Sequence, residues 1–384
     1  MKLPGENLQK KITDNRVSLV KCGTYDPQQV QQAVRAAMEH LGGLSRFVRP
    51  ASSVLIKPNL LMAKGPETGI VTHPQVVRAV IRLLKEQNCR IFVGDGPSVW
   101  GRYIEDVDTV YQITGIKAVC EEEDVELVKF ESRRWHGKFP LSTWLDTCNH
   151  VINIPKFKTH DLTLLTGAVK NLYGLVSGTF KTELHKAYYR KEEFSKVLLD
   201  IYEDVKPSLT IVDGITALEG DGPATRGLVR EAGILVAGSD CVAIDMILAR
   251  IMGIDPKEVM TIREAKRRGV GSVDFSDIEI AGESLEDINT RPFILPSTSL
   301  KKNLPQWLVG LATQMIRYYP QVNHRRCIKC CACVQACPMK IIRLRDGRIT
   351  IDLRKCIACF CCQEVCPSAA IFVKKSWFAR AIGL

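Results

Sequence analysis

The segment CIKCCACVQACPMKIIRLRDGRITIDLRKCIACFCCQEVCP, residues 327–367, contains two cysteine runs with the same spacing. In each run the four cysteines are separated by two, two and three residues, and a proline follows the last one. The runs are Cys327, Cys330, Cys333 and Cys337, then Cys356, Cys359, Cys362 and Cys366. The second lies 29 residues after the first, and the same offset carries Arg325 onto Arg354 and Ile342 onto Ile371. This pattern predicts an internal duplication whose halves are related by a pseudo-twofold axis.

The spacing is typical of iron–sulfur ligation, because three thiolates from one tight loop can reach three irons of a cube while the fourth comes from elsewhere. In modules with two such runs, the fourth cysteine of each run binds the other cluster. The sequence therefore predicts two [4Fe-4S] clusters, one held by Cys327, Cys330, Cys333 and Cys366 and the other by Cys356, Cys359, Cys362 and Cys337. Between the runs, IIRLRDGRITI predicts a hairpin that turns at Asp346-Gly347.

About fifty residues of this region resemble the two-cluster bacterial ferredoxins. A glycine commonly follows the second ligand in those proteins, whereas Cys331 and Phe360 stand there in this chain. Cys331 and Cys361 are not needed as ligands. We interpret them as small buried side chains, and a ligand-switching role is the alternative.

Composition indicates a soluble protein with more than one folding unit. The chain has 384 residues, of which 46% are hydrophobic and 25% charged. The N-terminal MKLPGENLQKK has no apolar signal region, and no stretch is apolar for long enough to span a membrane. We therefore expect a cytoplasmic protein whose crowded cysteines bind metal rather than form disulfides.

Positive charge is concentrated at the C-terminus. The net charge is +11, and residues 325–384 hold 12 basic and 3 acidic residues. Cluster charge or an acidic redox partner explains this excess more simply than nucleic acid does. We expect a redox partner protein, as electron donor or acceptor, and no nucleic-acid partner.

From about residue 17 to 282, short β-branched runs alternate with amphipathic helical stretches, which is typical of an α/β fold. The strand candidates are SVLIKPN, RIFVGDG, HVINIPK, LTIVDG and GILVAG. We predict a mostly parallel sheet flanked by helices, plus a small C-terminal α+β ferredoxin-like domain with two clusters. The predicted divisions are an α/β domain at 1–289, a connector at 290–324, the ferredoxin-like domain at 325–375 and a basic, aromatic tail at 376–384. Within the connector, residues 307–316 fit an amphipathic helix.

Polar residues gather directly after the predicted strands. Open parallel sheets bind ligands at this edge. The candidates are Lys57, Asn59, Asp95, Asn153, Lys156, Lys158, His160 and Asp213, with Lys170, Asn171 and His185 further along. In an extended chain Lys156, Lys158 and His160 alternate and point the same way, and such a face suits an anion. Asp240 is expected to cap a helix, whereas Asp245 lies in an apolar segment and needs a partner.

Residues from about 54 to 256 resemble the family called domain of unknown function 362, often joined to ferredoxin modules. The resemblance rests on IKPNL, VGDG, NIPKFKTH, GAVKNLYG, IVDGITALEGDGP and SDCVAID. It implies that Lys57, Asn59, Lys156, Lys158, His160, Lys170, Asn171, Asp213 and Asp245 are recurring polar positions of the family.

The leading hypothesis is a ferredoxin-coupled oxidoreductase. Its clusters would pass single electrons to a small anionic substrate held over the strand ends by Lys156, Lys158 and His160, with His160 or His185 as proton donor. One alternative is an electron carrier or assembly factor whose α/β domain binds a partner protein. The other is a non-redox lyase or isomerase with structural clusters. A further metal or flavin in the α/β domain stays open.

Overall fold

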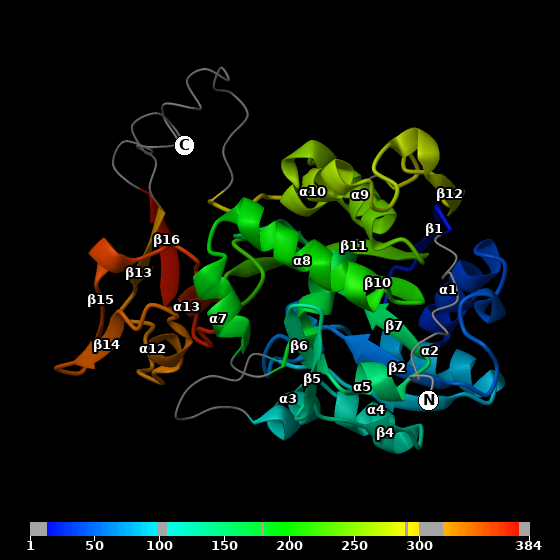
Figure 1. The fold of residues 1–384 in the computed structure, drawn as a ribbon, viewed down its shortest axis with the longest axis horizontal. Coiled ribbons are helices and arrows are strands. Elements are labelled where there is room, and N and C mark those ends of the chain that lie inside the picture. Colours follow the sequence, from blue (N-terminus) through cyan, green and yellow to red (C-terminus); the bar gives the residue numbers. More distant parts are fainter. Residues whose placement is uncertain (1–13, 98–105, 178–179, 289–290, 299–317, 376–384) are drawn as a thin grey trace, which may run out of the picture.

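The computed structural model describes residues 14–97, 106–177, 180–288, 291–298 and 318–375 (Figure 1). The helix expected at 307–316 and the tail at 376–384 lie outside these ranges. Within the described residues, no helix has the length and apolar character needed to cross a membrane.

The larger part of the chain is built on one ten-stranded sheet, in the order β12-β1-β11-β10-β7-β2-β3-β4, with β8 and β9 attached to β10. Its strands are β1 (Arg16–Lys21), β2 (Ser53–Pro58), β3 (Arg90–Val93), β4 (Glu126–Leu127), β7 (His150–Ile154), β8 (Lys156–His160), β9 (Leu164–Thr166), β10 (Leu209–Gly220), β11 (Gly227–Gly238) and β12 (Glu279–Gly282). The pairings of β7, β2, β3 and β4 are parallel, so the fold is the α/β architecture that the alternating pattern predicts.

Helices cover both faces of the sheet (Figure 1). They are α1 (Pro27–His40), α2 (Pro74–Glu86), α3 (Val107–Ile113), α4 (Ile116–Glu122), α5 (Trp144–Thr147), α6 (Ala168–Asn171), α7 (Phe180–Ala187), α8 (Lys191–Val205), α9 (Cys241–Met252) and α10 (Met260–Arg268). Successive strand residues face opposite cores: Leu55 packs with α8 and α9, while Val54 and Ile56 pack with α1 and α2. The strands β2, β3 and β7 are mostly apolar because both of their faces are buried.

Local cues set several element boundaries as expected. The side chain of Asp26 accepts hydrogen bonds from the amides of Gln28 and Gln29, and α1 begins at Pro27. Asp240 caps α9 in the same way, through the amides of Val242 and Ala243. The cap at Asp240 confirms the expectation from the sequence, and Asp26 acts as a cap in the same way.

Two features of the sheet differ from a simple parallel arrangement. β10 and β11 form a long antiparallel hairpin, and β11 also pairs antiparallel with β1. The expected strand HVINIPK ends at Ile154, because Pro155 has no amide proton for the ladder, and the chain resumes as β8. This break lets β8 leave β2 and lie beside β10, with β9 on its other side.

The C-terminal module begins earlier than the predicted boundary at residue 325. β13 (Tyr318–Val322) pairs with β16 (Ile371–Lys375), so the last part of the expected connector is a strand of this module. The remaining elements are α12 (Ala332–Ala336), β14 (Ile342–Arg345), β15 (Arg348–Ile351) and α13 (Cys361–Glu364). β14 and β15 form the hairpin predicted at Asp346-Gly347, where both residues have positive φ.

The duplication is visible in the backbone. Lys329, Cys331 and Lys340 have φ values of 58°, 61° and 53°, and the residues 29 positions later, Ala358, Phe360 and Ala369, have 53°, 58° and 51°. Cys331 and Phe360 thus adopt the left-handed conformation for which glycine is commonly used. The two runs fold alike even where their side chains differ.

Gly167 precedes α6 and provides a test of packing near the sheet edge. A Cβ added at Gly167 would lie 2.1 Å from Oδ1 of the buried Asp245. We expect Gly167→Ala to lower the free energy of unfolding by about 1–3 kcal/mol because this part of the core is already full. Thermal unfolding of both proteins checks this.

Gly23→Ala is the matched control, because a Cβ there meets no atom within 4 Å. Equal unfolding midpoints for the two variants would contradict the close packing of Gly167 against Asp245.

Candidate functional site

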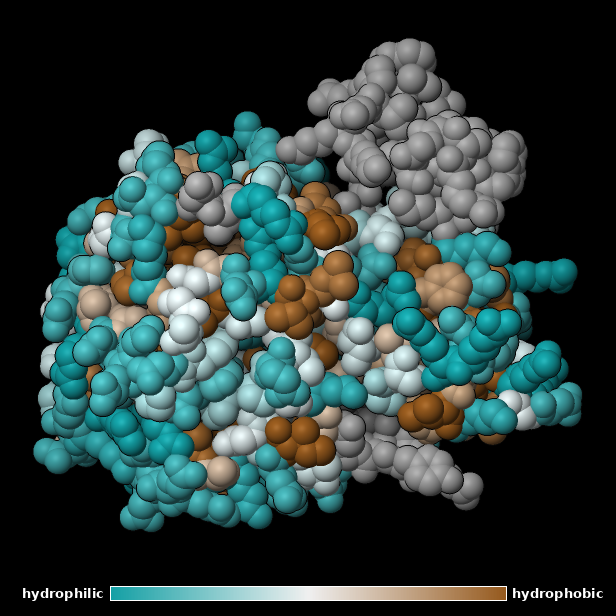
Figure 2. Space-filling view, turned by 180° about the vertical axis from the view of Figure 1, so that it is seen from behind, coloured by the Kyte–Doolittle hydropathy of each residue, from teal (hydrophilic) through white to brown (hydrophobic). Residues whose placement is uncertain are grey.

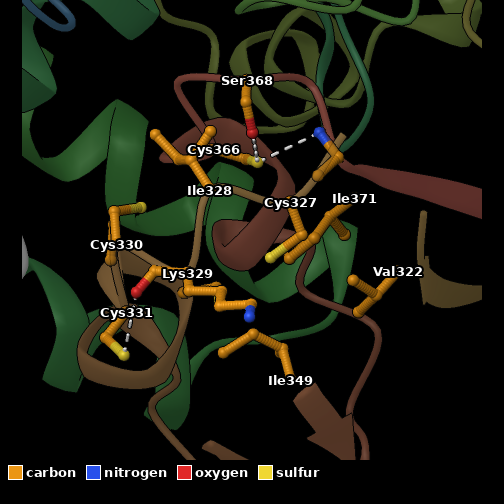
Figure 3. Close-up of a pocket in the computed structure, with 13 residues that line it drawn as sticks. Val322, Cys327, Ile328, Lys329, Cys330, Cys331, Ile349, Cys366, Ser368 and Ile371 are labelled. Atoms are coloured by element: carbon orange, nitrogen blue, oxygen red, sulfur yellow. Dashed lines mark hydrogen bonds between the residues drawn. The ribbon is translucent and has the colours of Figure 1, made fainter. Parts of the chain in front are cut away.

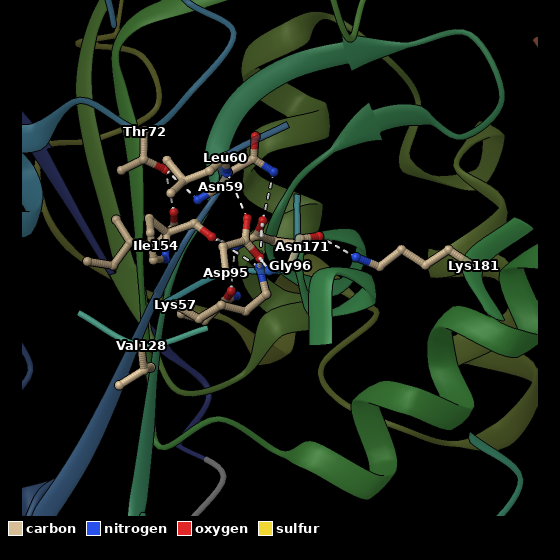
Figure 4. A network of polar contacts seen from close by, with 12 residues as sticks. Lys57, Asn59, Leu60, Thr72, Asp95, Gly96, Val128, Ile154, Asn171 and Lys181 are labelled. Carbon is tan, nitrogen blue, oxygen red and sulfur yellow. Dashed lines mark hydrogen bonds and ion pairs between the residues drawn. The ribbon is translucent and has the colours of Figure 1, made fainter. Parts of the chain in front are cut away.

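A buried polar network surrounds Lys57 at the end of β2 (Figure 4). Its ammonium lies 2.7 Å from Oδ1 of Asp95, and both side chains are buried. Asp95 also accepts the amide of Leu60 at 2.8 Å. Burial lowers the pKa of Lys57, and Asp95 opposes that shift. Lys57 and Asp95 therefore neutralise each other and fix the loops after β2 and β3.

Asparagine side chains extend this network toward α6. Asn171 accepts from Nδ2 of Asn59 at 2.8 Å and donates to Oδ1 of Asn153 at 2.8 Å. Asn153 in turn donates to the carbonyl oxygen of Ala168. The structure thus brings together the loop after β2, strand β7 and α6, although Asn59 and Asn171 lie 112 positions apart in the chain.

Lys156 and Asp213 form a second buried ion pair, 2.8 Å long. Tyr25 donates to Oδ1 of Asp213 at 2.8 Å and accepts from the Lys156 ammonium at 2.7 Å. The amide of His73 supplies a third donor to Asp213. The charge on Lys156 is therefore matched inside the protein by Asp213, whose carboxylate accepts from three donors.

Lys158 and Lys170 have no carboxylate within ion-pair distance among the described residues. The Lys158 ammonium donates to Oδ1 of Asn59 at 2.7 Å and to the carbonyl oxygen of Ile70 at 2.6 Å. The Lys170 ammonium lies over the rings of Tyr173 and Phe194, at 5.8 and 5.9 Å from their centroids. Burial is the main cause that lowers the pKa of both lysines, and their mutual repulsion adds to it for Lys158. An anion placed here would relieve that cost.

His160 ends β8 against the C-terminal module. Its Nδ1 accepts the amide of Leu162 at 3.0 Å, which places the proton of the neutral ring on Nε2. Nε2 lies 3.4 Å from Oε1 of Glu364, the last residue of α13. Burial holds the pKa of His160 well below its usual value, and Lys170 and Lys158 add to the effect. His160 is therefore a neutral hydrogen-bond donor.

The next residue makes a second contact with α13. Nε2 of Gln363 donates to Oδ2 of Asp161 at 2.5 Å, and both side chains are buried. Nearby, the hydroxyl of Thr225 donates to the carbonyl oxygen of Cys366 at 2.8 Å. The second cysteine run is thus attached to the strand ends of the sheet.

His185 lies on α7, stacked on Phe194 at 4.5 Å between ring centroids and edge-on to Tyr173 at 5.4 Å. Burial lowers its pKa to about 3, with help from Lys170 and Lys181. Lys181 itself donates to the carbonyl oxygen of Gly96. His185 is therefore neutral, and like His160 it lies near the charge of Lys170.

Several buried polar atoms at this junction have no hydrogen-bond partner among the described residues. They are His160 Nε2, Glu364 Oε1, Gln363 Oε1, Asp161 Oδ1, Thr166 Oγ1 and His185 Nδ1. Buried polar groups are normally paired, and a group of unpaired ones is most often satisfied by water or a ligand. The unpaired atoms come from both parts of the chain, which makes the junction a candidate ligand site.

Asp245 supports this junction without reaching it. Its carboxylate accepts the amides of Ala168 at 2.6 Å and Val169 at 3.2 Å, which fixes the first turn of α6. Lys170 and Asn171 lie on that turn. Burial raises the pKa of Asp245 to about 7, although the two amides lower it. The amides of Ala168 and Val169 are thus the partners that the buried Asp245 carboxylate was expected to need.

The cysteines line two separate cavities in the module. Cys327, Cys330, Cys333 and Cys366 line one of them, together with Cys331 (Figure 3). Cys337, Cys356, Cys359 and Cys362 line the other. Cys361 lines neither cavity and is buried, as expected. Cys331 is partly exposed, so the expected burial is wrong for this residue, and its thiol donates to the carbonyl oxygen of Lys329.

These cavities fit iron–sulfur clusters. Sγ of Cys366 accepts the amide of Ala370 at 3.2 Å, and Sγ of Cys356 accepts that of Ala358 at 3.4 Å, as cluster-bound sulfurs commonly do. Four thiols around one cavity match the donor set of a cube. Within the described ranges, no group of three or more His, Cys, Asp or Glu side chains is arranged to hold a single metal ion.

Sequence reasoning did not single out Tyr25, Asp161, Tyr173, Gln363 and Glu364. Asp161 directly follows a predicted strand-end residue, which was the available cue. Glu364 is the one acidic residue between Cys356 and Cys366, in a strongly basic module. No local pattern predicts their partners, because each contact joins distant parts of the chain.

Comparison with known proteins agrees with this division of the chain. The family described as domain of unknown function (DUF362) matches residues 54–250, and the 4Fe-4S dicluster domain matches residues 319–367. "Thylakoid-associated protein sll1697" of Synechocystis sp. (strain ATCC 27184 / PCC 6803 / Kazusa) is 33% identical over 267 residues, which cover 66% of this chain and 79% of that protein. The lactate racemase apoprotein from Thermoanaerobacterium thermosaccharolyticum is similar at 11% identity and a TM-score of 0.38, over 66% of this chain and 59% of that one.

Because His185 is buried in its neutral form, we expect the free energy of unfolding to depend on pH. The folded pKa of about 3 lies below the usual 6.5, so the contribution to stability is complete above pH 6.5 and is lost as the pH falls toward 3. Between pH 6.5 and 5 the loss is about 2 kcal/mol. His185→Phe, which keeps a ring on Phe194, should reduce the fall of the unfolding midpoint in anaerobic thermal scans.

The difference in unfolding midpoint between the wild type and His185→Phe at each pH gives the contribution of His185, because the acid sensitivity of the rest of the chain is common to both proteins. Parallel pH profiles would show that the ring titrates normally in the folded protein.

Proposed function

Because the chain belongs to the domain of unknown function 362 family and carries a 4Fe-4S dicluster domain, we propose that it is an iron–sulfur oxidoreductase acting on a small anionic substrate. The observation that carries the proposal is the contact of α13 with the end of β8. There His160 Nε2 lies 3.4 Å from Glu364 Oε1, beside the unmatched charges of Lys158 and Lys170. The second cysteine run and the cationic strand ends therefore form one site.

In this proposal the two cysteine sets hold two [4Fe-4S] clusters, which supply single electrons when bound. Cys327, Cys330, Cys333 and Cys366 hold one, and Cys337, Cys356, Cys359 and Cys362 the other. Two electrons and two protons added to a reducible double bond of the substrate balance one turnover. The electrons come from a one-electron carrier protein and the protons from solvent.

The residues at the junction would divide the remaining work. Lys158 and Lys170 would bind the anionic group, because their charges have no carboxylate at ion-pair distance in the described structure. His160 would donate its Nε2 proton as a hydrogen bond to the reacting group, with His185 close by. Lys156, already paired with Asp213, would orient β8 and contribute to the positive field. Lys57, Asn59, Asp95, Asn153, Asn171 and Asp213 would hold the site in shape.

The cellular location of the protein is also a proposal. We expect it in the cytoplasm, and the relative described as thylakoid-associated favours a membrane surface as the alternative. Fractionation of cells into soluble and membrane pools, followed by immunodetection, decides between the two.

Substrate-driven oxidation of the reduced clusters is the direct test. The anaerobically purified protein is reduced with dithionite, freed of reductant and mixed with a panel of small carboxylates and phosphate esters while the visible absorption is followed. We expect one class to speed reoxidation. Lys158→Met and Lys170→Met should each slow it by about tenfold or more, because a charge-assisted contact to the anion is lost.

Lys257→Met, an exposed lysine outside the junction, is the control and should leave the rate unchanged. Reoxidation that no member of the panel affects would contradict the enzyme proposal and favour an electron carrier whose α/β domain binds a partner protein.

The cysteine assignment has its own test in iron and sulfide analysis. Cys330→Ala and Cys359→Ala should each lose about four iron atoms, since one cube loses a ligand. Cys331→Ala and Cys361→Ala should keep the full iron content, because their thiols contact backbone carbonyls instead.

Full iron in Cys330→Ala, or loss of iron in Cys361→Ala, would overturn this division of ligands and spare thiols.

A further inference from the structure

The outer face of the C-terminal module carries an exposed apolar side chain beside the first cysteine set. Ile328 is 64% exposed, the highest value of any large hydrophobic side chain in the described ranges. It follows Cys327 directly and lines the same cavity as Cys327, Cys330 and Cys366. Leu344 on β14 is also exposed. We call Ile328, Lys329 and the hairpin β14–β15 the outer face.

The loop and the hairpin of the outer face are continuous. Nζ of Lys329 lies 3.6 Å from the position of a Cβ at Gly347, in the hairpin turn. The hairpin adds the exposed Arg343, Arg345 and Arg348. Figure 1 shows β14 and β15 on the side of the module away from the large sheet, whereas α13 faces the sheet. The outer face is thus distinct from the candidate substrate site.

Charge on this module is not matched by its own acids. Ten basic residues between positions 318 and 374 have described side chains, and none of them forms an ion pair in the described structure. They are Arg325, Arg326, Lys329, Lys340, Arg343, Arg345, Arg348, Arg354, Lys355 and Lys374. In the space-filling view, long hydrophilic side chains project around separate hydrophobic ones on this side of the molecule (Figure 2).

We propose that the outer face is the docking surface of a small acidic electron-carrier protein, which reduces the chain through the first cysteine set. An apolar centre within a rim of unpaired positive charge is the arrangement that a transient partner of opposite charge fits. The carrier gives up one electron per encounter and leaves oxidised, so charge balances when two encounters serve one turnover. This inference rests on the proposed electron-transfer function and specifies where electrons enter.

The position of the two faces supports this direction. Two cysteines of the first set, Cys327 and Cys330, are partly exposed beside Ile328, whereas in the second set Cys356 is partly exposed and the other three are buried, and α13 contacts the large domain. An electron that enters at the outer face therefore reaches the first set before the second.

Charge reversal on the hairpin tests the docking surface. The probe is a reduced plant-type ferredoxin, a small acidic [2Fe-2S] protein, mixed anaerobically with the oxidised full-length chain in a stopped-flow instrument. For the wild type we expect the second-order rate to fall about tenfold or more between about 50 and 500 mM salt, because screening removes steering. Arg345→Glu with Arg348→Glu should lower the rate about tenfold or more at low salt.

Arg133→Glu with Arg134→Glu is the matched control, since it makes the same charge change on the exposed hairpin β5 (Arg133–His136) to β6 (Phe139–Ser142) of the large domain. Its rate should stay within about twofold of the wild type. Iron content of both double variants confirms that the clusters are retained. Equal rates for the two double variants would overturn the proposal.

Two further measurements separate this inference from its rivals. Binding to vesicles of anionic lipid or to single-stranded RNA that disappears in the hairpin variant, with an unchanged ferredoxin rate, would assign the face to another anion and overturn the proposal. Substrate-driven reoxidation of the dithionite-reduced hairpin variant should match the wild type. A salt-sensitive ferredoxin rate without any substrate effect would support the docking surface while the oxidoreductase proposal fails.

Discussion

Burial of lysine ammonium groups at one edge of the sheet is the constraint on which the rest of the structure depends. An isolated charge in a protein interior is very costly, so each buried lysine needs a partner or a ligand. Lys57 has Asp95, and Lys156 has Asp213 with Tyr25. These pairs fix the loops after β2 and β3 and hold β8 beside β10, around the two lysines whose charges are not matched in this way. The paired lysines thus act as a rigid frame for Lys158 and Lys170.

The C-terminal module completes that edge. α13 contacts the end of β8, where His160 and Asp161 are buried. Gln363 donates a hydrogen bond to Asp161, and the Glu364 carboxylate lies beside His160. Burial of these groups strengthens the electrostatic interactions between them. The fusion of the two parts therefore does more than hold an electron carrier nearby, because the module supplies one wall of the candidate site.

Much of this fold follows from local pattern. Asp26-Pro27 marks the start of α1, Asp346-Gly347 marks the hairpin, and apolar runs mark strands that are buried on both faces. Each of these depends on neighbours within a few residues. The antiparallel pairing of β11 and the assignment of residues 318–322 to the module depend on contacts between distant segments. Periodicity specifies which side of a strand is buried but not which strand lies beside it.

The candidate site shows the same contrast between what local sequence predicts and what contacts between distant residues decide. Position after a strand was enough to collect Lys57, Asn59, Asp95, Lys156, Lys158 and His160 at one edge. It was not enough to separate Lys156, whose charge Asp213 neutralises, from Lys158, which has only neutral acceptors. That distinction depends on Tyr25 and His73, which precede Lys156 by more than 80 residues. Two lysines on one face of one strand thus differ in function because distant residues decide which charge is already matched. In the proposed site the ligand would lie at the unmatched lysine, next to α13 within the second cysteine run.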